Sequence, residues 1–348
     1  APVMKKLFRN IICLLAIGAL EACSLSQVSV TATATLPAGF TENQAKTLAS
    51  LKKVDDHPLY TMQYYGEYDS PQTSLLPAGQ EAASPPSWAC SLFTVLLDED
   101  HLLYGRNFDW EFSPALLLFT DPPDGYASVS MVVFAYLGFS GQTVFDLTKL
   151  PLQELKGLLN APQMPFDGMN EHGLAIGMAA VDPGNMQPDP SKKTISSLGI
   201  IREILDHARD VDEALNLIKK YNINFQGGPP IHYLIADANK RAILVEFYQG
   251  EMHVFENEQP WHSSTNFLHA AVEDPKGNCW RYDRINARLN EKQGMLDSSS
   301  AMELLSEVAQ ESTQWSVVYQ MGRGEVSVAM GKDYSNVKTF RTSEYYPR

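Results

Sequence analysis

The feature that most constrains the fold is a pair of apolar runs that directly follows Cys90. Residues 91–97 are apolar and rich in strand formers, residues 98–100 (DED) form a turn, and residues 101–104 resume the apolar pattern. This arrangement predicts a β-hairpin, in which the second strand returns beside the start of the first. Arg106 and Asp109 would then lie next to Cys90. Because a nearby guanidinium lowers the pKa of a thiol and favours the thiolate, Cys90 is a candidate nucleophile.

Composition sets the size and class of the protein. The chain has 348 residues, of which 44% are hydrophobic and 20% are charged, as expected for a globular protein with one large domain or two ordinary ones. Its formal net charge of -14 argues against a nucleic-acid partner, because there is no basic stripe to neutralise phosphates.

The first 23 residues predict a signal peptide with a lipobox-like end. Residues 4–9 (MKKLFR) are basic, and the apolar run at 11–20 is too short to anchor the chain across a bilayer. Residues 20–23 (LEAC) resemble a bacterial lipobox, in which Cys23 would be lipidated. We therefore expect a bacterial envelope protein, periplasmic or secreted, whose membrane contact is a lipid anchor at Cys23. Plain secretory cleavage and an uncleaved segment are the alternatives.

The cysteines left after this segment are Cys90 and Cys279. They could form one disulfide in an oxidising compartment, although two free thiols are favoured. Their spacing matches no zinc pattern, so we predict no metal site.

The rest of the chain divides into three zones. Residues 24–40 consist mostly of Ser, Thr, Val and Ala and predict a flexible tether. Residues 41–89 contain a predicted helix (42–54), a predicted strand (58–65) and a predicted exposed loop (69–87). Residues 90–348 form the main domain. Within that domain the pattern predicts strands at 126–139, 231–237, 242–248, 252–256 and 315–330, and a tight turn that leads into a strand at 169–178. It predicts helices at 195–208, 211–221, 281–289 and 301–309. Such an order favours packed layers of helix and sheet over a doubly wound parallel sheet.

A set of motifs in a fixed order carries a family resemblance. The set comprises Cys90-Ser91, residues 104–110 (YGRNFDW), 169–174 (MNEHGL), 264–266 (STN) and 280–284 (WRYDR). With these motifs the chain resembles the choloylglycine hydrolase and penicillin V acylase family of N-terminal nucleophile hydrolases, a group that also includes acid ceramidase and N-acylethanolamine acid amidase. The resemblance implies an α+β fold, the four-layer αββα sandwich.

The resemblance also implies a reaction. The peptide bond between Ala89 and Cys90 would be cleaved, which makes Cys90 a new N-terminus. Its thiol would attack the carbonyl of a linear amide, and its own α-amine would act as the base. The expected partner is a small-molecule N-acyl amide with an apolar acyl group, and no cofactor is needed. Residues 41–89 would be a pro-segment that stays bound as a small subunit. No oligomeric state is predicted.

The remaining site residues follow by position in the motifs. Arg106 would steady the thiolate, Asp109 would orient the α-amine, and Asn266 would donate to the oxyanion. Arg281 would support the nucleophile, with Arg284 as the alternative match. Ala180 stands where bile salt members have a second oxyanion asparagine, which puts bile salt or penicillin V activity in doubt more than amide hydrolysis.

Other functions stay open from the sequence. The same acyl-enzyme could transfer its acyl group to another amine. An uncleaved thiol hydrolase could use a distant histidine such as His232 as the base. A binding lipoprotein could keep the fold without catalysis. We expect Asn170 to hold a turn, with Gly173 relieving backbone strain.

Overall fold

The structure is a computed structural model that describes residues 38–69, 89–139 and 146–346. The predicted signal peptide, the lipobox at Cys23, nearly all of the predicted tether and nearly all of the 69–87 loop lie outside these residues. Within the described ranges, no helix has the length and apolar character needed to cross a membrane.

The larger of two main sheets has nine strands in the order β1-β2-β5-β6-β7-β8-β11-β12-β13. Neighbours in this sheet run antiparallel except β2 and β5, which are parallel. The strands are β1 (Lys52–Asp55), β2 (Leu59–Tyr64), β5 (Ala115–Thr120), β6 (Ser128–Val133), β7 (Pro165–Asn170), β8 (Ala175–Ala180), β11 (Ile231–Ala236), β12 (Ala242–Tyr248) and β13 (Glu251–Glu256).

The second main sheet has six antiparallel strands in the order β14-β3-β4-β15-β16-β17. Its strands are β14 (Trp261–Ser264), β3 (Ala89–Leu96), β4 (Leu102–Asp109), β15 (Thr313–Gln320), β16 (Glu325–Met330) and β17 (Lys338–Arg341). A short parallel pair is formed by β9 (Lys193–Ser196) and β10 (Tyr221–Asn224).

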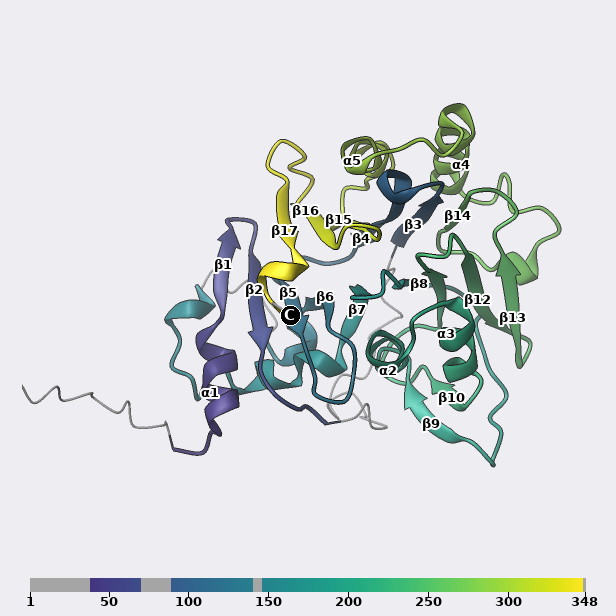
Figure 1. The fold of residues 1–348 in the computed structure, drawn as a ribbon. Helices are drawn as coiled ribbons and strands as arrows, with labels where there is room; N and C mark the ends of the chain where they lie inside the picture. Colours follow the sequence, from purple (N-terminus) through teal and green to yellow (C-terminus); the bar gives the residue numbers. More distant parts are fainter. Residues whose placement is uncertain (1–37, 70–88, 140–145, 347–348) are drawn as a thin grey trace, which may run out of the picture. The chain divides into compact units, whose positions relative to one another are not determined.

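Helices cover the outer faces of both main sheets. Helices α2 (Gly199–His207) and α3 (Val211–Ile218) pack on the nine-stranded sheet, and α4 (Trp280–Lys292) and α5 (Ser298–Glu307) pack on the six-stranded sheet (Figure 1). The inner faces of the sheets meet where β3 packs against β8 and β11. The layers are therefore helix, sheet, sheet and helix, and the predicted αββα sandwich is confirmed.

Most predicted elements are present, but several boundaries were wrong. The helix predicted for 195–208 begins at Gly199, because residues 195–196 belong to β9, and the helix predicted for 211–221 ends at Ile218. The helix predicted for 42–54 is α1 (Glu42–Ala49), which Thr41 and Gln44 cap; residues 52–55 pair with β2 instead. The strand predicted for 126–139 ends at Val133, where a 3₁₀ turn begins that closes at Gly138 with φ of 88°. Residues 315–330 form two strands, because the chain reverses between β15 and β16.

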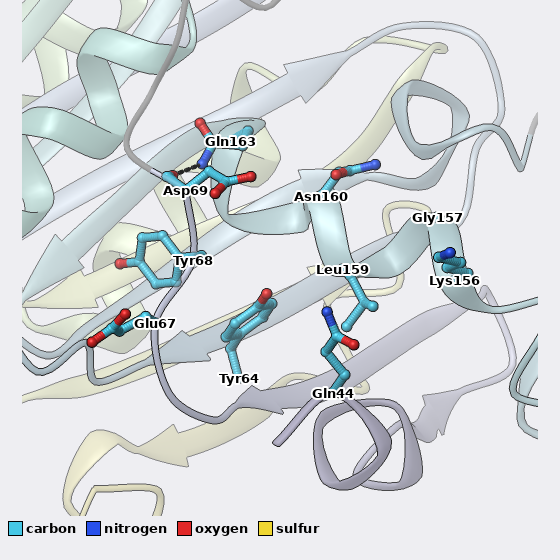
Figure 2. A pocket seen from close by; sticks show the side chains of 10 residues that line it. All are labelled: Gln44, Tyr64, Glu67, Tyr68, Asp69, Lys156, Gly157, Leu159, Asn160 and Gln163. Atoms are coloured by element: carbon cyan, nitrogen blue, oxygen red, sulfur yellow. Dashed lines mark hydrogen bonds between the residues drawn. The ribbon is translucent and has the colours of Figure 1, made fainter. Parts of the chain in front are cut away.

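The segment that precedes Cys90 in the sequence is part of the nine-stranded sheet. Strand β2 pairs with β5 from Leu59↔Ala115 to Tyr64↔Thr120, and most of its side chains are buried. Beyond β2, Tyr68 donates to Asp206 on α2 at 2.8 Å. A cavity of about 510 Å³ is lined by Tyr64, Glu67, Tyr68 and Asp69 together with residues of the short helix at 156–163. Figure 2 shows the side chains that line this cavity. This segment therefore packs as an integral part of the fold.

Candidate active site

The predicted hairpin places Cys90 at the start of β3, in register with Phe108 of β4. Its thiol is fully buried, and Arg106 Nη2 lies 3.5 Å from Sγ. Burial raises the pKa of the Cys90 thiol, and the Arg106 guanidinium opposes that rise. The chain is continuous through Ala89, so the nitrogen of Cys90 is an amide here and has no basic lone pair. In this uncleaved state the thiol is protonated and lacks an adjacent amine base.

The backbone of Cys90 is held by two side chains. Its N–H donates to Asn266 Oδ1 at 2.6 Å, and its carbonyl oxygen accepts from Arg281 Nη1. Arg281 also donates to Asn266 Oδ1 at 2.9 Å and to Ser91 Oγ at 3.0 Å. Arg284, by contrast, forms a half-exposed ion pair with Glu307 at 2.6 Å. Of the two arginines considered from the sequence, Arg281 is the one that reaches Cys90.

Asn266 links the two sheets at this point. It follows β14, and its Nδ2 donates at 2.9 Å to the carbonyl of Ala180, the last residue of β8. In the uncleaved chain Asn266 thus turns its oxygen toward Cys90 and an N–H toward Ala180. The Ala180 methyl group can donate no hydrogen bond, as the sequence indicated, and its contribution to the site is a backbone acceptor.

Arg106 has a buried counter-ion that the sequence analysis missed. Both Arg106 and Asp167 of β7 have fully buried side chains, and Arg106 Nη1 contacts Asp167 Oδ2 and donates to Phe166 O at 2.8 Å. The Tyr319 hydroxyl donates to the other carboxylate oxygen. Asp167 interrupts a buried strand just before the 169–174 motif. A charged residue within an apolar run was the signal that could have identified it.

Asp109 lies near Cys90 but has other partners in this state. It stands opposite Ala89 in the hairpin register. Its carboxylate accepts from Thr313 Oγ1 at 2.5 Å and from Gln310 Nε2 at 2.7 Å. Burial raises the pKa of Asp109, and these two donors oppose that rise. Its predicted contact with the α-amine applies to a cleaved chain and stays a prediction.

His232 is fully buried and occupied at both ring nitrogens. Nδ1 lies 2.9 Å from Glu246 Oε1, and Nε2 lies 2.8 Å from the carbonyl oxygen of Thr265. Burial opposes ionisation of Glu246, but His232 and the N–H groups of Ala270 and His269 lower its pKa below the usual value. Because a backbone carbonyl can only accept, His232 Nε2 is the donor to Thr265, and its Nδ1 faces the Glu246 carboxylate. Both ring nitrogens of His232 are therefore engaged by groups other than Cys90, which argues against His232 as the base of an uncleaved thiol hydrolase.

The turn at Asn170 and the state of the two described cysteines can also be compared with the predictions. Asn170 closes its turn by accepting from the N–H groups of His172 and Leu174, and Gly173 there has φ of 75°. Asn170 Nδ2 donates to the carbonyl of Ala208 at 2.7 Å, which supports a structural role. Cys90 and Cys279 are both free thiols, so the alternative disulfide is absent from the structure.

The hairpin thus brings Cys90, Arg106 and Asp109 together on a four-layer sandwich, and Asn266 and Arg281 from later elements bond to the backbone of Cys90. The sequence model of the linear amide C–N hydrolases, choloylglycine hydrolase family, matches residues 90–268. The chain belongs to this family. The match confirms the predicted family and, with it, the class of hydrolases that act on C–N bonds of linear amides.

Individual relatives are distant. A conjugated bile acid hydrolase from Clostridium perfringens, in a mutant form, is 17% identical with a TM-score of 0.51, covering 74% of this chain and 93% of its own. Penicillin V acylase from Agrobacterium tumefaciens is 16% identical with a TM-score of 0.47, covering 69% and 82%. An uncharacterized protein of Paramecium bursaria Chlorella virus 1 is 27% identical over 126 residues, which cover 34% of this chain and 45% of that protein. The chain thus spans less than half the length of this viral relative.

Proposed function

We propose that the protein is an amidase that hydrolyses the C–N bond of linear N-acyl amides through Cys90 as an N-terminal nucleophile. One observation carries this proposal: three side chains from separate elements converge on the three polar atoms of Cys90. Arg106 lies at the thiol, Asn266 at the nitrogen and Arg281 at the carbonyl oxygen. A cysteine with a purely packing role needs no such arrangement, because a free buried thiol behaves as a small apolar side chain.

The reaction requires that the bond between Ala89 and Cys90 be hydrolysed first. As long as residue 90 is internal, its nitrogen is an amide and cannot accept the thiol proton. Cleavage gives an α-amine, whose unperturbed pKa of about 8 suits a base near neutral pH.

The proposed turnover has two halves. The Cys90 thiol gives its proton to the α-amine and attacks the substrate carbonyl carbon, and the α-ammonium then protonates the leaving nitrogen as the C–N bond breaks. Water next attacks the thioester, with the α-amine taking its proton, and releases a carboxylic acid and the free thiol. Arg106 would stabilise the thiolate. Asn266 would donate to the oxyanion once its Nδ2 turns from the Ala180 carbonyl toward the substrate.

The N-terminal part of the chain is given two further roles in this proposal. Residues 41–89 would be a pro-segment that remains bound after cleavage, which the pairing of β2 with β5 supports. The segment ending at Cys23 would direct the protein to the bacterial envelope, where the substrate is an N-acyl compound with an apolar acyl group.

The test is an intact-mass measurement with N-terminal sequencing of the purified protein beside a Cys90→Ala variant. We expect two fragments in the wild type, one of which starts at Cys90, and an intact chain in the variant. Cleaved protein should then release amine from a panel of N-acyl amides, and alkylation of the thiol should abolish that release. A wild type that stays whole at acidic and neutral pH would refute the mechanism.

A further inference from the structure

A buried histidine and a buried carboxylate form a hydrogen-bonded pair on the nine-stranded sheet. His232 of β11 and Glu246 of β12 are both fully buried, with Nδ1 and Oε1 2.9 Å apart. A buried pair of this kind is weak evidence for stability, because the cost of removing polar groups from water offsets their attraction. The mechanism described above uses neither residue.

The pair bonds to the backbone of one segment, residues 265–270. His232 Nε2 donates to the Thr265 carbonyl at 2.8 Å, and Glu246 accepts the N–H groups of His269 at 3.0 Å and Ala270 at 2.9 Å. The 265–270 segment is therefore held at both ends by two side chains that are anchored in the other sheet. Hydrogen bonds to charged groups are stronger than neutral ones, so these contacts fix the segment firmly.

The second residue of the 265–270 segment, Asn266, is the one that touches Cys90. Asn266 directly follows Thr265, and its Oδ1 accepts the N–H of Cys90 at 2.6 Å. The carbonyl of Thr265 belongs to the peptide unit whose nitrogen is that of Asn266, so fixing this carbonyl fixes the plane from which the Asn266 side chain leaves. A rotation of this peptide would move the side-chain amide away from both Cys90 and Ala180.

We propose that His232 and Glu246 are positioning residues that act through Asn266. They hold the backbone at Asn266 so that its side-chain amide stays within hydrogen-bond distance of the nitrogen of residue 90. This rests on the proposed function, in which Asn266 serves the reaction at Cys90. The contact itself exists in the uncleaved chain, so it can be tested without turnover.

The first experiment measures hydrogen exchange of the residue 90 amide in the full-length Cys90→Ala protein, which cannot be cleaved. This amide bonds to the Asn266 side chain, and it serves as the reporter of the position of Asn266. We expect Glu246→Gln and Asn266→Ala each to speed its exchange by roughly tenfold, the effect of losing about one hydrogen bond, while amides inside β3 such as that of Val95 change little. The proposal is overturned if Asn266→Ala exposes this amide and Glu246→Gln does not, or if all β3 amides speed up together.

Matched variants separate positioning from general damage. Asp206→Asn removes another buried carboxylate, one that pairs with Arg202 at 2.9 Å, and should leave the residue 90 amide protected. His232→Gln can retain a donor toward the Thr265 carbonyl and should keep part of the protection that His232→Leu loses. If Glu246→Gln fails to fold, the two His232 variants decide the question.

The second experiment compares cleavage rates at Ala89–Cys90 for Glu246→Gln, Asn266→Ala and the double variant, with Cys90 intact. If Glu246 acts through Asn266, the double variant cleaves no more slowly than Asn266→Ala alone. Independent effects that multiply would contradict the proposal. A wild type that never cleaves would refute the proposed function, whereas the exchange experiment would still decide the role of His232 and Glu246.

Discussion

Replacing Asp167 with asparagine should destabilise the protein strongly although the two side chains have nearly the same shape. Asp167 and Arg106 are both fully buried, and the guanidinium contacts one carboxylate oxygen while Tyr319 donates to the other. Asparagine removes the negative charge and leaves the cation uncompensated. Removing one partner of a buried pair costs about 3–5 kcal/mol. For a chain of this length, that loss lowers the melting temperature by about 5–8 °C.

The assay is urea unfolding with a thermal melt, performed in the Cys90→Ala background so that every variant keeps one continuous chain. Arg284→Gln is the control, since it breaks a half-exposed ion pair with Glu307 and should cost at most about 1 kcal/mol. The double change Arg106→Met with Asp167→Asn removes both charges, and we expect it to be more stable than Asp167→Asn alone.

Two results would refute this reasoning. A cost below about 1 kcal/mol for Asp167→Asn would mean that the carboxyl carries no charge in the folded protein. A double variant less stable than Asp167→Asn would mean that the cost comes from packing and not from an uncompensated guanidinium. In either case Arg106 would need another explanation for its position beside the Cys90 thiol.

Three shorter predictions concern cleavage, the arginines and pH. After cleavage, the fragment that ends at Ala89 should co-elute with the fragment that starts at Cys90 in size-exclusion chromatography, and the two should separate in denaturant. Met62→Asp puts a charge into the buried strand β2 and should release the fragment that ends at Ala89 without denaturant. Arg281→Ala should slow cleavage by roughly tenfold or more, because it removes donors to Cys90 and Asn266, while Arg284→Ala should leave the cleavage rate unchanged. Burial lowers the pKa of His269 from 6.5 to about 4, so between these pH values the unfolded chain binds a proton that the folded protein does not. The free energy of unfolding should therefore rise by up to about 3 kcal/mol from pH 4 to 6.5. Urea titrations should find this pH dependence in the wild type and not in His269→Phe.

The hairpin and the order of the motifs could be predicted because their signals are local. The alternation of apolar runs with an acidic turn after Cys90 predicted β3 and β4, and the register of that pair follows from the turn. The layered fold followed from the family resemblance. The helix at 42–54 was overextended because helical spacing continues to Val54, while pairing of residues 52–55 with β2 decides the structure there.

The partners of the buried charges could not be predicted. Asp167 and Glu246 each interrupt an apolar strand, which marks them as buried charges in need of a partner. Arg106, the partner of Asp167, comes from a distant strand of the other sheet, so this pairing depends on how the sheets are stacked. His232 lies on the strand next to that of Glu246, and the pairing of β11 with β12 brings these two side chains together. The orientation of Asn266, with its oxygen toward Cys90, likewise depends on donors from Cys90 and Arg281 that no local pattern specifies.

A new chain end usually frays, because a terminal residue loses its covalent neighbour and regains conformational entropy. Cys90 differs in that its nitrogen and its carbonyl are bonded to Asn266 and Arg281, both of which lie later in the sequence and stay covalently attached to it after the cut. A terminus created at residue 90 would therefore be preorganised from the moment it forms. The entropic cost of ordering the nucleophile is then met once, during folding, and does not recur in each catalytic cycle.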